Sequence, residues 1–390
     1  MKNSSQKSYR EQPVSKTYCD RLYTELHIEE DGSVTPCCVM PSNRFPMGSN
    51  LEEYVSGKPL KDLRKALNSG IQHKNCEWCW KNEAAGLKTH RIPTPRKREL
   101  NSIHIRLNNV CNFKCRMCNP SFSSTWAQEN KKHNYFVFED NEVFKDAIEH
   151  NGDYLFDMIK SGIQSSSLKH ISLSGGEPLI SDSHIKLMNF LLDNDLVNVS
   201  LGYSTNLSNL NYKGFDCIVA WEQFKSVNLE ASVDGWGAAV EYSRTGFSMK
   251  TFMDNFKDAF RYIHTINCVV NIYSVWSLPY IERFRKFGIN IVYSPCHLPI
   301  HCNPQILMRE DKEKLADLYA EYPALVDVYK KFIDTDLENG YDVEDVFAEP
   351  EHYSLQSIRH KMISYNTLLD NYRDTNFFDV FPVYKKYKET

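Results

Sequence analysis

Residues 110–120 read Val110-Cys111-Asn112-Phe113-Lys114-Cys115-Arg116-Met117-Cys118-Asn119-Pro120. Three cysteines in this stretch have the spacing Cys-x3-Cys-x2-Cys. Three thiolates can bind three irons of a four-iron cluster and leave the fourth iron without a protein ligand. An open position lets a metal bind a substrate or cofactor directly, as catalytic zinc sites do. We therefore predict a reactive iron-sulfur site at Cys111, Cys115 and Cys118. A zinc knuckle or three buried cysteines are the alternatives.

Length and composition indicate a globular protein with metal sites. The chain has 390 residues, 42% of them hydrophobic and 25% charged, and a net charge of −4. This charge gives no reason to expect nucleic acid or a membrane as a partner. We expect a cytoplasmic protein, because no apolar run approaches the length of a membrane span and the first residues lack the apolar core of a signal peptide. Eight of the 12 cysteines lie within the first 118 residues, which in a reducing compartment favours metal binding over disulfides.

A second motif, Ser174-Gly175-Gly176-Glu177-Pro178, follows about sixty residues later at the end of a predicted strand, 170–174. Glycines allow the backbone to approach a ligand closely, and a carboxylate can accept hydrogen bonds from an ammonium group. A Gly-Gly-Glu-Pro sequence alone is often only a turn. After a strand, and after the cysteine stretch, it predicts a ligand site.

Together the two motifs resemble those of the radical S-adenosylmethionine (SAM) superfamily. The resemblance implies that Cys111, Cys115 and Cys118 bind a [4Fe-4S] cluster, and that Gly175, Gly176, Glu177 and Pro178 form the GGEP motif that holds the SAM amino group. It also implies an oxidoreductase-type reaction, in which the reduced cluster cleaves SAM to methionine and a 5′-deoxyadenosyl radical that abstracts hydrogen from a substrate. A reductase or a flavodoxin- or ferredoxin-type protein would supply the electron.

Further residues match positions near SAM in this superfamily. Arg244, within Glu241-Tyr242-Ser243-Arg244-Thr245-Gly246, matches an arginine that pairs with the SAM carboxylate, and a guanidinium can bind a carboxylate with two hydrogen bonds. Thr245 departs from the glycine common in relatives, and Met117 stands where an aromatic residue is common. The alternatives are a helix cap for the residues near 204–206 and a simple turn at 234–235. The other cofactor-binding candidates are Met117, Ser204, Asn206, Ser232 and Asp234.

Five more cysteines precede the cysteine stretch. Residues 19–28 read as a strand, residues 30–33 as a hairpin turn and residues 34–37 as the returning strand, which would place Cys19 and Cys37 on neighbouring strands. With Cys76 and Cys79 they could form a closed four-thiolate site, either an iron-sulfur cluster or a zinc ribbon. The set resembles the twitch (half-SPASM) module, which holds an auxiliary [4Fe-4S] cluster but usually follows the radical SAM core. Cys38 is the alternative to Cys37 as a ligand, and we expect it to point the other way.

The fold expected is α/β, because predicted strands alternate with amphipathic helices from residue 102 onward, one of them over residues 248–263. Helices are also predicted over residues 59–68 and 363–369. A radical SAM core of this kind is a partial (β/α)6 TIM-type barrel, with a small α+β iron-sulfur domain before it and a mostly helical extension after it. Cys296, His297, His301 and Cys302 lie close together, but without a standard zinc spacing. The predicted boundaries are a polar tail (1–16), the twitch-like domain (17–90), a linker (91–100), the core (101–300) and the extension (301–390).

Relatives with SPASM or twitch modules often modify peptides or proteins, so a peptide or protein side chain is the leading substrate class. A small molecule of cofactor biosynthesis is the second. A non-catalytic iron-sulfur sensor or electron carrier is the alternative from another class, and it would need neither Glu177 nor Arg244.

Overall fold

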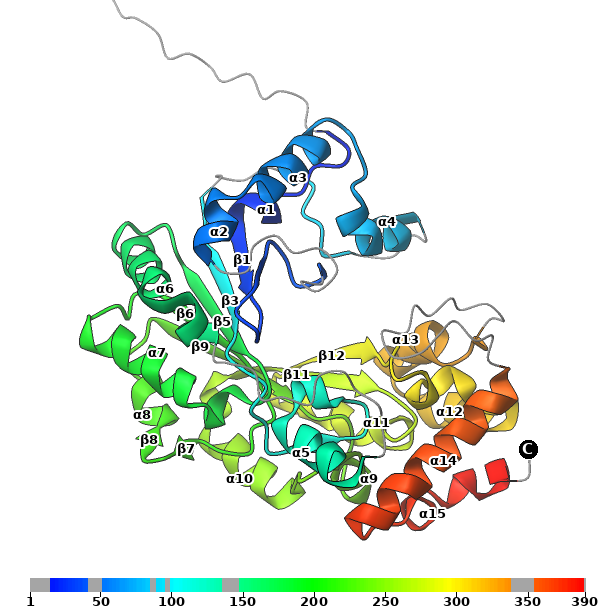
Figure 1. The fold of residues 1–390 in the computed structure, drawn as a ribbon. Coiled ribbons are helices and arrows are strands. Elements are labelled where there is room, and N and C mark those ends of the chain that lie inside the picture. The colour runs from blue at the N-terminus through cyan, green and yellow to red at the C-terminus, as the bar shows by residue number, and fades with distance from the viewer. Residues whose placement is uncertain are drawn as a thin grey trace, which may run out of the picture. The chain divides into compact units, whose positions relative to one another are not determined.

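The computed structural model describes residues 15–40, 51–84, 89–94, 99–134, 147–337 and 354–388. The chain divides into two compact units (Figure 1). Unit 1 consists of residues 1–108, 144–173 and 186–201, and unit 2 of residues 109–143, 174–185 and 202–390. Both units combine helices with strands, which confirms the α/β class. Among the described residues, no helix has the length and apolar character needed to cross a lipid bilayer.

Unit 1 contains the strand order β5-β3-β1-β2. The β1–β2 hairpin is confirmed, with Gly32 in its turn at a φ of 82° that favours glycine. β1 also pairs in parallel with β3. The strands of this unit are β1 (Glu25–Ile28), β2 (Val34–Thr35), β3 (Ser102–Arg106) and β5 (His170–Ser174), and its helices are α1 (Arg21–Thr24), α2 (Leu51–Ser56), α3 (Lys58–Asn68), α4 (Glu77–Ala84) and α6 (Ala147–Gln164).

The prediction that Cys19 and Cys37 lie on neighbouring strands was wrong. Cys19 precedes α1, and β1 begins only at Glu25. Cys37 lies two residues beyond the end of β2. The alternation of apolar and polar residues corresponds to a strand only from residue 25 onward. Residues 21–24 form one helical turn, in which Leu22 and Thr24 are buried.

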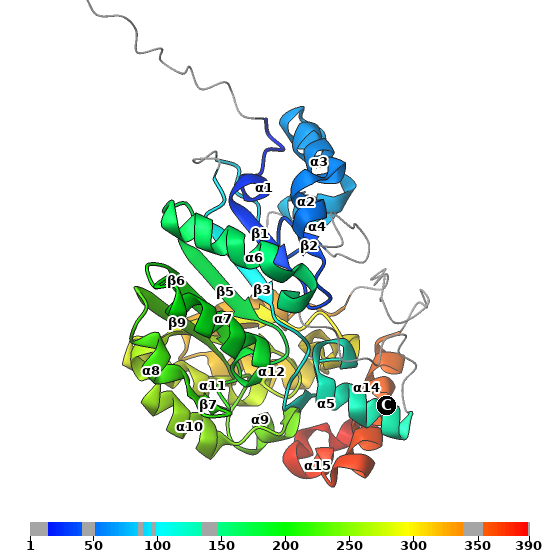
Figure 2. The same ribbon diagram turned by 60° about the vertical axis from the view of Figure 1, so that its left-hand side comes forward.

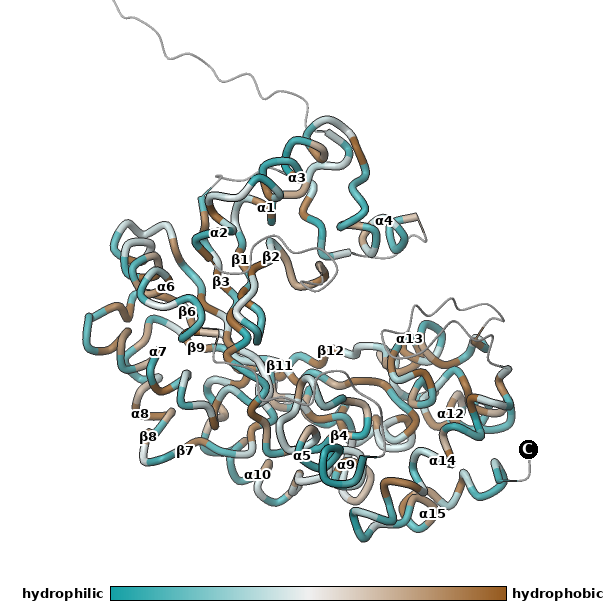
Figure 3. Tube along the Cα trace, in the orientation of Figure 1, coloured by the Kyte–Doolittle hydropathy of each residue, from teal (hydrophilic) through white to brown (hydrophobic). Residues whose placement is uncertain are grey.

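Helix α3 follows the predicted range closely. It is mostly hydrophilic along its length (Figure 3), yet Leu60, Leu63 and Leu67 recur at helical spacing and are buried. Helix α6 runs alongside the strands of unit 1 (Figure 2). Its Asn151 side chain accepts a hydrogen bond from the backbone of Leu51 (2.8 Å) and donates one to the carbonyl of Gly32 (3.1 Å). These bonds connect α6 to α2 and to the hairpin.

Unit 2 contains the strand order β12-β11-β9-β6, of which β9, β11 and β12 pair in parallel. The parallel pairing was predicted, and closure into a partial barrel stays a prediction. Helix α10 is shorter than the predicted 248–263, because strand β11 already begins at Ile263. The strands are β4 (Lys114–Cys115), β6 (Ser200–Thr205), β7 (Asn211–Tyr212), β8 (Phe215–Asp216), β9 (Ser226–Ser232), β10 (Arg244–Thr245), β11 (Ile263–Val270) and β12 (Asn290–Pro295), of which β6 begins in unit 1.

The helices of unit 2 include a C-terminal group whose last long member, α14, is much longer than the predicted 363–369. Aromatic residues after α14 are buried against it and against β11, so the aromatic end of the chain packs as core. The helices are α5 (Ser124–His133), α8 (Cys217–Trp221), α9 (Ala238–Ser243), α10 (Met249–Asp258), α11 (Leu278–Ile281), α12 (Arg309–Tyr319), α13 (Pro323–Phe332), α14 (Leu355–Arg373) and α15 (Phe377–Val380), and α7 (Asp182–Asp193) continues from unit 2 into unit 1.

Burial of α3 generates a stability prediction. Leu63 is 1% exposed, so Leu63→Ala leaves a cavity and should lower the free energy of unfolding of unit 1 by about 2–5 kcal/mol. Lys65→Ala on the exposed face of the same helix should change it by less than about 0.5 kcal/mol. Urea unfolding followed by circular dichroism measures both. Equal effects of the two substitutions would contradict the described packing.

Candidate functional site

The cysteine loop, residues 111–118, lies at the start of unit 2 and follows β3 along the chain. The side chains of Cys111, Cys115 and Cys118 are half-buried and form no disulfide. The backbone N–H of Phe113 donates to the Cys111 Sγ (3.4 Å), and that of Cys118 donates to the Cys115 carbonyl (3.0 Å). Hydrogen bonds to sulfur tune iron-sulfur clusters, so this turn already provides one contact of that kind.

The electrostatics of the three thiols fit a cationic group between them. Burial raises the pKa of each thiol, and the pKa of Cys118 rises to about 12, in part because Cys115 is a neighbouring thiolate when ionised. The pKa of Cys111 is raised by the same neighbour. Neighbouring thiolates repel one another, and a bound metal would balance their charge. Metal binding would also displace the thiol protons. The loop therefore fits the cluster that the sequence predicts.

The glycines of the second motif are required by geometry. Gly175 has a φ of 137°, which side-chain-bearing residues rarely adopt. A Cβ atom on Gly176 would lie 2.7 Å from the carbonyl carbon of Asn109 and nearer still to the carbonyl of Val110. The next residue, Glu177, donates its backbone N–H to the Val110 carbonyl (2.7 Å). The glycine motif thus lies directly against the residue that precedes the cysteine loop.

Glu177 is almost fully buried, and its carboxylate accepts three hydrogen bonds from the protein. Its Oε1 accepts from the Thr205 hydroxyl (2.7 Å) and from the Leu179 N–H (3.1 Å), and its Oε2 accepts from the Asn206 N–H (2.6 Å). Burial nevertheless raises its pKa to about 7. A nearby cation stabilises the ionised form of a buried carboxyl group. An ammonium group is such a cation, and it would lower the pKa of Glu177.

Arg244 lies opposite Cys115, in the antiparallel pair that β10 forms with β4. Its Nε donates to Asp234 Oδ2 (2.7 Å), while Asp234 Oδ1 accepts from the Val269 N–H (2.8 Å). Burial alone would lower the pKa of Arg244, but the Asp234 carboxylate raises it, so the guanidinium stays positively charged. Among the hydrogen bonds of the described residues, none uses the terminal nitrogens of Arg244. These two nitrogens can bind a carboxylate with two hydrogen bonds.

The other predicted cofactor residues differ in their surroundings. Asn206 joins the site, because its Nδ2 donates to Asn112 Oδ1 (3.1 Å) in the cysteine loop. The Ser204 hydroxyl instead donates to Glu230 (3.4 Å), and Met117 packs on the apolar core beside β11 and the C-terminal helices. None of the contacts described for Ser204 and Met117 joins them to Glu177 or Arg244. Two candidates have structural positions: Pro178 is buried at the start of a 3-10 helix (Pro178–Ile180), and Ser232 is the β9 residue opposite Asn267 of β11.

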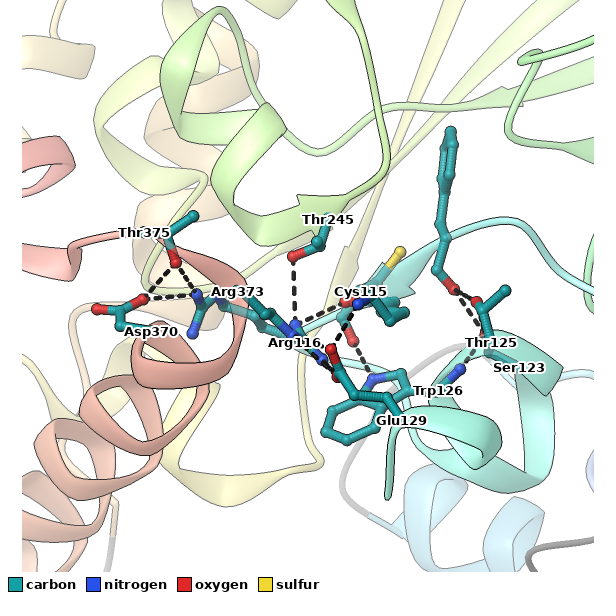
Figure 4. A network of polar contacts seen from close by, with 12 residues as sticks. Cys115, Arg116, Ser123, Thr125, Trp126, Glu129, Thr245, Asp370, Arg373 and Thr375 are labelled. Atoms are coloured by element: carbon teal, nitrogen blue, oxygen red, sulfur yellow. Dashed lines mark hydrogen bonds and ion pairs between the residues drawn. The ribbon is translucent and has the colours of Figure 1, made fainter. Parts of the chain in front are cut away.

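Two fully buried arginines support the cysteine loop and were not foreseen from the sequence (Figure 4). Arg116, between two of the cysteines, donates to Asp370 (2.7 Å) and Thr375 (3.0 Å) and lies 3.8 Å from the centroid of the Tyr242 ring. Arg373 at the end of α14 forms an ion pair with Glu129 of α5 (2.6 Å). Their partners lie about 250 residues away along the chain, and a local pattern cannot reveal such pairs.

The four N-terminal cysteines all belong to unit 1 and are near one another. Burial raises the pKa of Cys76 to about 12, and ionised Cys19 and Cys79 raise it further. The pKa of Cys37 is raised by burial and then by Cys38, Cys76 and Cys19. Cys38 is exposed, with its Sγ 3.8 Å from His90 Nδ1, so Cys37 is the better candidate ligand.

A single metal ion finds no ready site in the part of the chain that the structure describes. No group of three or more His, Cys, Asp or Glu side chains is gathered closely enough there for one ion. The thiolates of a four-iron cluster bind different irons and stand further apart than the ligands of one ion. Cys296, His301 and Cys302 are buried, and this finding gives no support to a mononuclear site there either.

Comparisons with known proteins give little further information. No family profile and no curated protein matches the sequence. Among solved structures, the chain is similar to Streptococcus suis SuiB bound to precursor peptide SuiA, with 10% sequence identity, a TM-score of 0.36, and coverage of 75% of this chain and 70% of that chain. This likeness is too low to define the fold or the function, so both depend on the residues described above.

Contact between the glycine motif and the cysteine loop leads to a second prediction. Gly176→Ala forces its new methyl group into the backbone at residues 109–110 and should displace the loop, so that the protein retains less than about half of the iron bound at Cys111, Cys115 and Cys118 after anaerobic reconstitution.

Gly214→Ala is the matched control. Gly214 has a positive φ of 85°, and a methyl group there meets nothing within 4 Å. Its cost is backbone strain of about 1–2 kcal/mol, and its iron content should equal that of the wild type. Normal iron content in Gly176→Ala would refute the close contact.

Proposed function

We propose that this chain is a radical SAM enzyme whose cysteine loop binds a [4Fe-4S] cluster with one open iron. The observation that carries the proposal is the assembly, within unit 2, of three half-buried thiols, a glycine motif against Val110, the buried carboxylate of Glu177 and an arginine with two open nitrogens. The thiols fit the cluster and the other groups fit different parts of SAM, whereas a purely structural site would need only the thiols.

The residues have separate roles in holding the cofactor. Arg244 binds the SAM carboxylate through its terminal nitrogens, since its Nε is already held by Asp234. Glu177 supplies negative charge for the SAM ammonium group, and the glycines let the backbone beside it approach a ligand closely. Asn206 fixes Glu177 through its backbone and the cysteine loop through its side chain, which connects the two ends of the cofactor site.

Cys111, Cys115 and Cys118 would hold the cluster, which would supply the one electron needed to cleave SAM to methionine and a 5′-deoxyadenosyl radical able to take a hydrogen atom from a substrate C–H bond. The electron comes from a flavodoxin- or ferredoxin-type donor. The protein must keep water and other hydrogen donors away, and the half-buried thiols and buried Glu177 provide such an environment.

We also propose that Cys19, Cys37, Cys76 and Cys79 bind an auxiliary [4Fe-4S] cluster in unit 1. The mutual influence of the four thiols supports this assignment. Arg91 connects α4 to the Cys19 segment, because it forms an ion pair with Glu83 (2.7 Å) and donates to the carbonyl of Tyr18 (2.9 Å). This brings the two halves of the ligand set into one small framework.

The substrate class that we propose is a peptide or protein side chain, which rests on the resemblance of the cysteine pattern to twitch enzymes. A non-catalytic iron-sulfur sensor or electron carrier is the competing function. It explains the thiols but leaves the open nitrogens of Arg244 and the raised pKa of Glu177 without a purpose.

The metal content tests the two cysteine sets. Anaerobically reconstituted protein should contain about eight irons, and the triple substitution of Cys111, Cys115 and Cys118 by alanine should leave about four. Iron, sulfide and zinc analysis with Mössbauer spectroscopy gives the count. Four irons together with one stoichiometric zinc in the wild type would refute the auxiliary cluster while leaving the main one intact.

SAM binding tests the enzyme itself. Arg244→Gln combined with Asp234→Asn removes the charge pair without leaving a buried charge unpaired, and SAM affinity should fall about ten- to a hundredfold, because a charge-assisted contact contributes about 1.5–3 kcal/mol. Arg261→Gln is the control, since Arg261 is exposed. Wild-type protein with a full cluster and dithionite that forms no 5′-deoxyadenosine from SAM would favour the electron carrier.

A further inference from the structure

The carbonyl oxygens of residues 113–116 are all held by side chains. Two of the holding groups come from α5 and its N-terminal cap: Ser123 donates to the Phe113 carbonyl (2.6 Å) and the Trp126 indole donates to the Cys115 carbonyl (2.9 Å). The other two come from α14. These are Arg373, which donates to the Lys114 carbonyl (2.9 Å), and Tyr365, which donates to the Arg116 carbonyl (2.7 Å). Helix α14 therefore donates to two of these four carbonyl oxygens.

The same helix end also brings charge to the loop. Glu129 forms ion pairs with both Lys114 (2.5 Å) and Arg373 (2.6 Å), so two cations share one carboxylate and the trio carries a net charge of +1. Arg373 and Glu129 are buried, so solvent screens this charge weakly. Arg373 Nη1 donates to the peptide carbonyl directly before Cys115, which places the charge next to a cluster ligand (Figure 4).

The other ion pairs around the loop are neutral. Arg116 is balanced by Asp370 and Arg244 by Asp234. The trio of Lys114, Glu129 and Arg373 is thus the place where these ion pairs leave an excess of positive charge beside the cysteines. Net charge near an iron-sulfur cluster is one of the factors that set its reduction potential.

We propose that Arg373 is a positioning residue of the cluster site, and that the net positive charge of the Lys114–Glu129–Arg373 trio makes the cluster at Cys111, Cys115 and Cys118 easier to reduce. The inference rests on the proposed function only in requiring a cluster at these cysteines. Reduction adds a negative charge to the cluster, and a nearby positive charge stabilises the reduced form.

A charge series separates this effect from simple support of the loop. Arg373→Gln lowers the net charge of the trio from +1 to 0, whereas Glu129→Gln raises it to +2. The double variant Arg373→Gln/Glu129→Gln leaves Lys114 alone and restores +1, although the ion pair between α14 and α5 is gone. Lys114 is partly exposed and remains solvated in that variant.

The experiment is a redox titration of the anaerobically reconstituted full chain, followed by electron paramagnetic resonance. Arg373→Gln should lower the midpoint potential so that the reduced fraction at fixed poise falls about tenfold, which is about 59 mV for one electron. Glu129→Gln should shift it in the opposite direction, and the double variant should return to the wild-type value. A double variant that stays as low as Arg373→Gln would overturn the proposal in favour of support alone.

Arg359→Gln is the matched control on the same helix. Arg359 also binds carbonyl oxygens, those of Ile306 and Leu307, but it lies 14 residues from Arg373, about 21 Å along the helix axis. Its substitution loosens α14 without changing the charge at the loop, so the potential should not move. An equal shift in Arg359→Gln would refute the charge mechanism. Failure of the wild type to bind iron would instead refute the proposed function.

Discussion

The cysteine loop depends on hydrogen bonds that its carbonyl oxygens accept from side chains far away in the sequence. A loop that presents three thiols to one metal group cannot satisfy its backbone through regular secondary structure, and a half-buried backbone without partners is costly. Here α5 supplies donors from nearby in the chain and α14 supplies donors from its end. The glycine motif then approaches from a third direction, where any side chain would collide with Val110. The shape of the site follows from these three supports.

Ion pairs in the site have a second use besides neutralising charge. Asp234 binds Arg244 through Nε, the nitrogen nearest the chain, and so orients the guanidinium while its outer edge stays available for a ligand. Arg116 is in the opposite situation. Its guanidinium binds Asp370, Asn366, Thr375 and the Tyr242 carbonyl, so it acts only within the protein. Of these two arginines, Arg244 is thus the proposed ligand-binding group and Arg116 is a structural one.

The motifs of the site could be predicted from the sequence because they are local. The cysteine spacing, the Gly-Gly-Glu-Pro motif and the helix at 58–68 each depend on residues a few positions apart. The strand expected at Cys19 failed because alternation over ten residues did not reveal a single helical turn at 21–24. Arg116, Glu129 and Arg373 gave no indication at all, since their roles depend on partners that only the folded chain brings together.

The position of α14 in the chain determines when the cysteine loop gains its full support during synthesis. Asp370 and Arg373 emerge from the ribosome long after the cysteine loop, and Asp370 meets Arg116 across 254 residues. Until α14 has emerged, the loop lacks Tyr365 and Arg373, which are the donors to two of the four carbonyl groups of residues 113–116. Iron delivered during translation would therefore meet an incompletely supported loop, and a chain that stops before α14 would expose its thiols to oxidation. The cysteine loop therefore reaches its supported form only after α14 has been synthesised.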